Sequence, residues 1–102
     1  MFRRYSDVQF EFLSAVDGLE SERGVVIVRD GEMVLEVECP GDRPYSIRGT
    51  LSHDFFAGWH EDRTGDVAVV AKWIRLDNIY IGTWTEAGKD YLFKFRLPPD
   101  AV

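Results

Sequence analysis

The sequence has little cysteine, and this limits its covalent and metal chemistry. Cys39 is the only cysteine, so no disulfide bond can form within the chain. Neither a second cysteine nor a histidine lies close to it in sequence, and Cys39 therefore has no local partner for a metal site. We expect a reduced thiol with a structural role.

Long hydrophobic segments are also missing. The first residues, "MFRRYSDVQFEFL", place Asp7 and Glu11 where a secretory signal would need an uninterrupted apolar run. No segment approaches the roughly 20 apolar residues of a transmembrane helix. We therefore expect no membrane association, and the cytoplasm is the expected location.

Basic residues are fewer than acidic residues. The 102 residues include 12 Lys and Arg against 18 Asp and Glu, which gives a net charge of -6. A negative charge opposes binding to the phosphate backbone of nucleic acids and to anionic membrane surfaces. We expect no nucleic-acid partner.

The sequence contains no signature of catalysis. A Gly-rich phosphate loop, a nucleophile elbow, a Ser/His/Asp order and a pair of catalytic carboxylates are all absent. One polar cluster matches no zinc spacing, and its members fall in a predicted turn or at a strand end, where they would be solvated: His53, Asp54, His60, Glu61 and Asp62. We expect a protein that is not an enzyme, with no catalytic residues, no metal and no cofactor.

What the chain does contain is apolar and aromatic residues in a strand pattern. Hydrophobic residues make up 45% of the sequence and aromatic residues 14%, enough for one core that folds alone. Most of the chain alternates apolar and polar residues with a period of two, and turn residues interrupt it at short intervals. Residues 1–102 are thus predicted to form a single all-β domain. We expect an antiparallel meander of about eight strands, closed into a small up-and-down barrel.

Turn residues predict several strand pairings. Asp30-Gly31 has the preferred chemistry for a two-residue hairpin turn, which would place Val28 opposite Met33 on the core face. Asp77-Asn78 predicts another reversal. Between them, the run "VAVVA" at 67–71 is so apolar that we expect both faces of its strand to be covered.

The last hairpin, around residues 87–89, is compatible with two registers. A two-residue turn at Gly88-Lys89 would pair Trp84 with Phe93, whereas a three-residue loop would pair Ile81 with Phe93. The local sequence does not distinguish these registers.

Residues 6–19, "SDVQFEFLSAVDGL", fit two types of structure. Val8, Phe10 and Phe12 alternate as in a strand, and we favour this interpretation. The alternative is a helix capped by Ser6 or Asp7, whose apolar face would be Val8, Phe12, Ala15, Val16 and Leu19. The charged residues that follow are predicted to lie in a solvated loop: Glu20, Glu22 and Arg23.

Residues 44–97 resemble the calycin group of barrels, the avidins and lipocalins. The likeness rests on "RPYSIRGTL", "VAVVAKWIRLDN" and "IYIGTWTEAG", which echo three segments of avidin-like chains in the same order. This resemblance implies a calycin-like barrel. It also implies that Trp73 and Trp84 correspond to two tryptophans that wall a biotin-type pocket. A likeness of this kind concerns the fold and does not assign a function.

Aromatic residues are the candidates for a binding site, because pockets for small ligands are apolar and aromatic with a few polar groups. The candidate ligand-binding residues are Tyr45, Trp59, Trp73, Arg75, Tyr80, Trp84 and Tyr91. Arg75 would share a strand face with Trp73, where a guanidinium can close a barrel end or bind an anionic ligand.

Two functions remain open from the sequence. The first is a barrel that binds a small apolar or aromatic molecule at one end. The second is a structural or protein-interaction module, with a protein partner, whose aromatic residues serve only as core. A cavity connected to solvent would favour the first. The sequence does not predict an oligomeric state.

Overall fold

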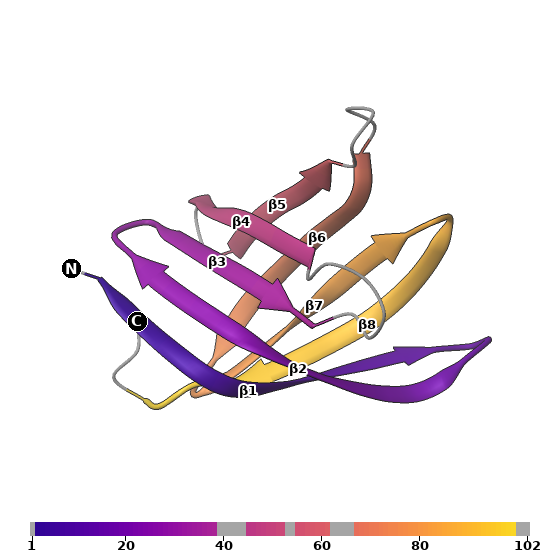
Figure 1. Cartoon of the computed structure of the whole chain (residues 1–102), viewed down its shortest axis with the longest axis horizontal. Coiled ribbons are helices and arrows are strands. Elements are labelled where there is room, and N and C mark those ends of the chain that lie inside the picture. Colours follow the sequence, from indigo (N-terminus) through magenta and orange to yellow (C-terminus); the bar gives the residue numbers. More distant parts are fainter. Residues whose placement is uncertain (1, 39–44, 53–54, 62–66, 100–102) are drawn as a thin grey trace.

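The computed structural model describes residues 2–38, 45–52, 55–61 and 67–99. These residues form eight β-strands, each hydrogen-bonded to the next, and the last also pairs with the first (Figure 1). The strands are β1 (Arg3–Ser14), β2 (Gly18–Arg29), β3 (Glu32–Val37), β4 (Tyr45–Ser52), β5 (Phe55–Glu61), β6 (Val67–Leu76), β7 (Ile79–Glu86) and β8 (Lys89–Arg96). The prediction of a closed, antiparallel, up-and-down barrel of eight strands is confirmed. No helix among the described residues could cross a membrane.

Two turns lie where the sequence predicts them. Arg29 pairs with Glu32 across Asp30-Gly31, and Gly31 has a φ of 69°. Leu76 likewise pairs with Ile79 across the second predicted turn. Positive φ at these tight turns is what Gly, Asn and Asp supply most easily, so the turn chemistry fixes both registers.

Both registers predicted for the last hairpin are wrong. Glu86 pairs with Lys89, so the two turn residues are Ala87-Gly88, with φ values of 50° and 77°. Trp84 therefore lies opposite Tyr91. A turn with positive φ at both central residues disfavours alanine, and this is why the sequence pointed to other positions.

The N-terminal segment is a strand, as we favoured, and not a helix. A short turn at 15–17 follows β1, where the backbone N–H of Asp17 donates to Ser14 Oγ at 2.9 Å and Gly18 has a φ of 71°. The chain then enters β2 directly. The prediction of a loop at Glu20, Glu22 and Arg23 is therefore wrong, because these residues continue the first hairpin as paired strand. Their predicted contact with solvent is confirmed for Glu20 and Arg23, which are exposed, whereas Glu22 is half-buried.

Inward-facing side chains fill the middle of the barrel. Trp73 lies near the centre and is 1% exposed. Its Nε1–H donates to Met33 Sδ at 3.3 Å, and its ring stacks on that of Phe56 with the centroids 5.7 Å apart. A Cβ atom on Gly49 would run into the Trp73 ring, so the glycine makes room for the indole. The largest of the fully buried side chains are Trp73, Tyr80, Phe10, Phe93, Phe95 and Met33.

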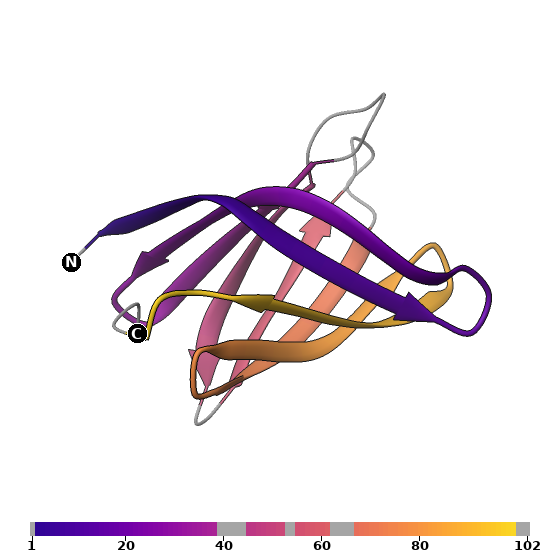
Figure 2. The same ribbon diagram turned by 90° about the horizontal axis from the view of Figure 1, so that it is seen from below.

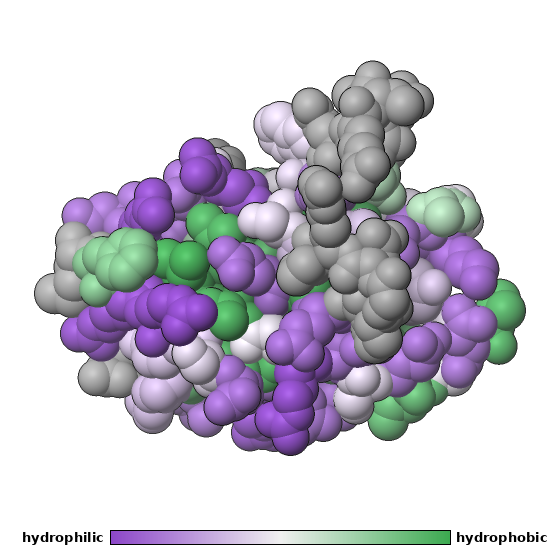
Figure 3. All heavy atoms as spheres, viewed as in Figure 1, coloured by the Kyte–Doolittle hydropathy of each residue, from purple (hydrophilic) through white to green (hydrophobic). Residues whose placement is uncertain are grey.

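The outer face of the barrel is in contact with solvent. Val70 is 43% exposed, so the expectation that both faces of 67–71 are covered is wrong. The reason is that no second layer of the described chain packs on the outside of the barrel. In Figure 3, hydrophilic residues cover most of the visible face and apolar residues form separate areas between them.

Different contacts hold the two ends of the barrel. The β6–β7 turn and the β1–β2 turn lie at opposite ends of the ribbon (Figure 2). Near the β6–β7 turn, Arg75 donates from Nε to the carbonyl of Asp77 at 2.7 Å and from Nη2 to the carbonyl of Pro99 at 3.1 Å. At the opposite end, Asp17 accepts from Lys89 Nζ at 3.4 Å and from the Tyr91 hydroxyl at 3.3 Å. The Asp17 contacts join the β1–β2 turn to β8. We call the end of the barrel that holds these contacts the β1–β2 end.

Candidate functional site

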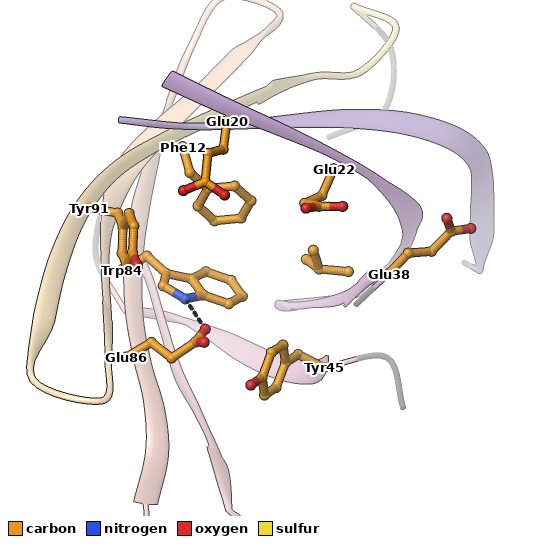
Figure 4. Close-up of a pocket in the computed structure, with 9 residues that line it drawn as sticks. Phe12, Glu20, Glu22, Glu38, Tyr45, Trp84, Glu86 and Tyr91 are labelled. Atoms are coloured by element: carbon orange, nitrogen blue, oxygen red, sulfur yellow. Dashed lines mark hydrogen bonds between the residues drawn. The ribbon is translucent and has the colours of Figure 1, made fainter. Parts of the chain in front are cut away.

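A pocket of about 190 Å³ opens at the β1–β2 end (Figure 4). It continues the barrel interior beyond the filled core. Its nine lining residues are Phe12 from β1, Glu20 and Glu22 from β2, Val37 from β3, Glu38, Tyr45 from β4, Trp84 and Glu86 from β7, and Tyr91 from β8. Pockets for drug-sized ligands measure about 300 to 1,000 Å³, so this one suits a smaller molecule.

Because of the register of the first hairpin, the side chains of two glutamates face the interior of the barrel. Glu20 lies opposite Phe12, and Glu22 lies opposite Phe10. Paired residues of antiparallel strands point to the same side of the sheet, and both phenylalanines are buried. The two carboxylates therefore project toward the pocket, as Figure 4 shows.

The floor of the pocket is apolar. Phe12, Val37 and Trp84 are buried, with exposed fractions of 8%, 3% and 2%. The rings of Phe12 and Trp84 meet edge to face, with centroids 5.1 Å apart. The Trp84 indole also packs against Phe93 of the core, with the ring centroids 5.5 Å apart. Trp84 is thus both part of the core and the base of the pocket.

Glu86 is held in place by the same indole. The Trp84 Nε1–H donates to Glu86 Oε1 at 3.0 Å. The two residues lie two positions apart on β7, so they share its inward face. This hydrogen bond positions one carboxylate at the edge of the floor, opposite Glu20 and Glu22 (Figure 4).

Two tyrosines form part of the rim. The Tyr45 ring meets the Trp84 ring at 76°, with centroids 6.5 Å apart. Tyr91 donates its hydroxyl hydrogen to Asp17, and its ring meets Phe12 at 83°. Burial raises the pKa of the Tyr91 hydroxyl, and the nearby Asp17 carboxylate raises it further. The hydroxyl therefore stays neutral at physiological pH and remains a donor.

The remaining lining residues give the pocket a negative charge. Four of the nine are glutamates, and none is basic. Among the ion pairs of the described residues, none involves Glu20, Glu22, Glu38 or Glu86. Three of the carboxylates, those of Glu20, Glu22 and Glu86, face the pocket, whereas that of Glu38 points away from it (Figure 4). None of the four has a cationic partner in the described part of the chain.

These carboxylates surround a space and do not converge on a point. Over the described ranges, no three His, Cys, Asp or Glu side chains are placed to hold a metal ion. Of the polar cluster near residue 60, His53, Asp54 and Asp62 lie outside the described residues. His60 donates from Nδ1 to the carbonyl of Ser46 at 3.2 Å, and its ring contacts Tyr45 at 5.3 Å.

Three of the seven candidate residues meet at the pocket, namely Tyr45, Trp84 and Tyr91. Trp73 and Tyr80 point inward but are fully buried in the core, each 1% exposed. Packing around them leaves no space for a ligand, so they are core residues and do not line the pocket.

Trp59 and Arg75 do not line this pocket, so the structure does not bring them together with the other candidates. Trp59 pairs with Arg48 and Val70 on the outer face and is 59% exposed. The alternation of β5 sends it outward because Phe56 and Gly58 occupy the inward positions. Arg75 lies near the far end of the barrel, bonded to the C-terminal segment.

Sequence analysis missed six lining residues: Phe12, Glu20, Glu22, Val37, Glu38 and Glu86. The dipeptide Asp17-Gly18 marks the reversal after β1 but does not give its register. A two-residue turn there, like the one at Asp30-Gly31, would pair Glu20 with Ala15. The observed turn at 15–17 instead pairs Ser14 with Gly18 and Glu20 with Phe12, and this pairing makes Glu20 inward-facing.

No protein-family model, no curated protein and no solved structure matches this chain.

Proposed function

We propose that this protein is a non-enzymatic barrel that binds a small ligand in the pocket at its β1–β2 end. The observation that carries the proposal is a solvent-connected pocket with an apolar floor, built on the inward faces of strands whose other inward residues fill the core. Preformed concave sites with aromatic walls and a few placed polar groups are typical of ligand binding. The proposal retains the expected cytoplasmic location and the absence of a nucleic-acid partner. The calycin likeness supports it only as a resemblance of fold.

The barrel itself supplies the rigidity that such a site needs. Trp84 and Phe12 are fixed by edge-to-face contacts with each other and, in the case of Trp84, with Phe93 of the core. Tyr91 is fixed through its hydroxyl to Asp17. Ligand binding would therefore require little ordering of these side chains, which reduces the entropic cost of association.

One observation favours the alternative function, a protein-interaction module. Leu13 pairs with both Leu19 and Leu92, so three exposed leucines lie side by side on β2, β1 and β8. Leu19 is 64% exposed, Leu13 48% and Leu92 55%. Exposed apolar groups on neighbouring strands can mediate protein contacts. This surface lies outside the barrel and is compatible with ligand binding inside it.

A thermal-shift screen tests the proposed function. The screen should contain cationic, neutral and anionic compounds of up to about ten heavy atoms, since the pocket is small. A ligand that binds only the folded protein raises its stability by about 2.7 kcal/mol at one hundred times its Kd. We expect at least one compound to raise the Tm in a concentration-dependent way.

A pair of tyrosine variants locates the binding. Tyr45→Ala removes a ring from the pocket, whereas Tyr5→Ala removes a half-buried ring on β1 that also packs on the core but does not line the pocket. The ligand-induced shift should disappear in the first variant and persist in the second. A shift retained by Tyr45→Ala and lost in Tyr5→Ala, or a screen without any stabilising compound, would contradict the proposal.

A further inference from the structure

We infer that the ligand of the pocket at the β1–β2 end is a small organic cation of the substituted-ammonium type, a free molecule and not a metal ion. This inference rests on the proposed function and adds the chemical class of the ligand. It follows from three features of the pocket: its aromatic floor and walls, the placement of its carboxylates, and its size.

The aromatic rings offer the surfaces that an organic cation prefers. A cation within about 6 Å of a ring centroid is attracted by the negative face of the ring, most strongly for Trp and Tyr. Tyr45 and Phe12 meet Trp84 at 76° and 77°, so the rings stand at steep angles to one another like the sides of a box. Rings in this arrangement can surround a rounded cationic group, whereas a flat neutral aromatic ligand is better accommodated between parallel rings.

The carboxylates add charge selectivity around these rings. Glu20 and Glu22 project from one side, and Glu86 lies on the opposite side next to the indole (Figure 4). Glu86 uses Oε1 for the Trp84 hydrogen bond, and its other oxygen has no hydrogen bond within the described part of the chain. An anionic ligand would be repelled by these groups, and a neutral one would gain nothing from them.

A metal ion fits the pocket less well than an organic cation. Calcium requires six to eight oxygen ligands at about 2.3 to 2.6 Å. No three acidic side chains of the described residues come together in this way. A substituted ammonium ion spreads its charge over a larger surface and binds through rings and separated carboxylates.

The size of the pocket limits the ligand to a small molecule. Its volume of about 190 Å³ is close to that of the roughly 150 Å³ cavity that accommodates benzene in another protein. Tetramethylammonium, choline and phenethylammonium are of this size class, and they serve as probes. The opening to solvent leaves room for a longer substituent to project out.

Isothermal titration with choline and its neutral carbon isostere tests the requirement for charge. The isostere has a carbon atom in place of the quaternary nitrogen and therefore the same shape. We expect saturable binding of choline or one of the two other cations. For choline, we expect the isostere to bind at least about tenfold more weakly, because it lacks the attraction to rings and carboxylates.

Glutamine variants test the role of the carboxylates. Glu20→Gln combined with Glu22→Gln removes two charges from the pocket with little change in shape. Neither side chain is buried, since Glu20 is exposed and Glu22 half-buried. We expect about a tenfold or larger loss of cation affinity. Glu36→Gln removes one charge from the outer face of β3 and should leave the affinity within about twofold. The reason is that water and salt screen the electrostatic interaction between this side chain and a ligand in the pocket. Thermal melts establish that each variant folds.

The outcomes separate this inference from the proposed function. Cation binding that weakens in the pocket variant and not in Glu36→Gln supports both. Equal affinity for choline and its isostere, or a neutral or anionic screening hit that is unaffected by the glutamine changes, overturns the cation inference and leaves the ligand-binding function intact. Displacement of choline by calcium at the same stoichiometry also overturns it. No binding by any cation or any screened compound overturns both.

Discussion

The Trp73→Ala variant is expected to lose about 3 to 5 kcal/mol of unfolding free energy, a large part of the stability of a domain of this size. Trp73 is 1% exposed and touches Met33, Phe56 and the Cα region of Gly49. Truncation would remove one of the two tryptophan side chains of the core and leave a cavity that the closed barrel cannot collapse around. Circular dichroism melts and urea titrations measure the loss.

Trp59→Ala is the matched control for this substitution. Trp59 lies on the neighbouring strand β5 but faces outward and is 59% exposed. We expect its truncation to cost less than about 1 kcal/mol, as is usual at surface positions. Equal losses in the two variants would show that the inward and outward faces of β5 and β6 are misassigned.

The Trp84→Ala variant is expected to lose stability and ligand binding together. Trp84 is 2% exposed, and its ring contacts Phe12, Phe93 and Tyr45. Its removal should cost about 3 to 5 kcal/mol, as for other buried tryptophans, and much of the protein should be unfolded. Denaturant titration again gives the magnitude.

Trp84→Phe separates the two roles of this residue. A phenyl ring retains part of the packing but lacks the N–H that Glu86 accepts. We expect a smaller loss of about 1 to 2 kcal/mol, a folded protein and weaker cation binding, because the Glu86 carboxylate is no longer held at the floor. A stable, well-folded Trp84→Ala protein would contradict the assignment of Trp84 to the core.

The fold was predictable where two local signals agreed. At Asp30-Gly31, the turn dipeptide and the alternation on both sides point to one register, and that register is observed. At the last hairpin the signals disagreed, because Ala87 adopts a positive φ that its side chain disfavours. The closure of β8 onto β1 depends on three residue pairs far apart in sequence, which no local pattern specifies.

The site was only partly predictable for a related reason. Residue type alone suggests tyrosine and tryptophan as ligand contacts, and Tyr45, Trp84 and Tyr91 do line the pocket. Residue type does not show whether a ring points outward, as Trp59 does, or is enclosed by core, as Trp73 is. Glu20 and Glu22 were missed because charged residues in "GLESERG" are typical of solvated loops. Their inward direction follows only from their pairing with β1.

The indole N–H resonances of the protein offer the most direct test of the central claim, that an organic cation binds at the β1–β2 end. The three tryptophans occupy three environments: Trp84 lies at the pocket floor, Trp73 in the core and Trp59 on the outer face. Single substitutions to phenylalanine assign each signal in a nitrogen–proton correlation spectrum. We predict that tetramethylammonium, choline or phenethylammonium shifts the Trp84 signal in a saturable way, that the Trp59 signal stays in place, and that the neutral isostere of choline has little effect. A Trp84 signal that does not move with any of these cations, or an equal movement of the Trp59 signal, would contradict the claim.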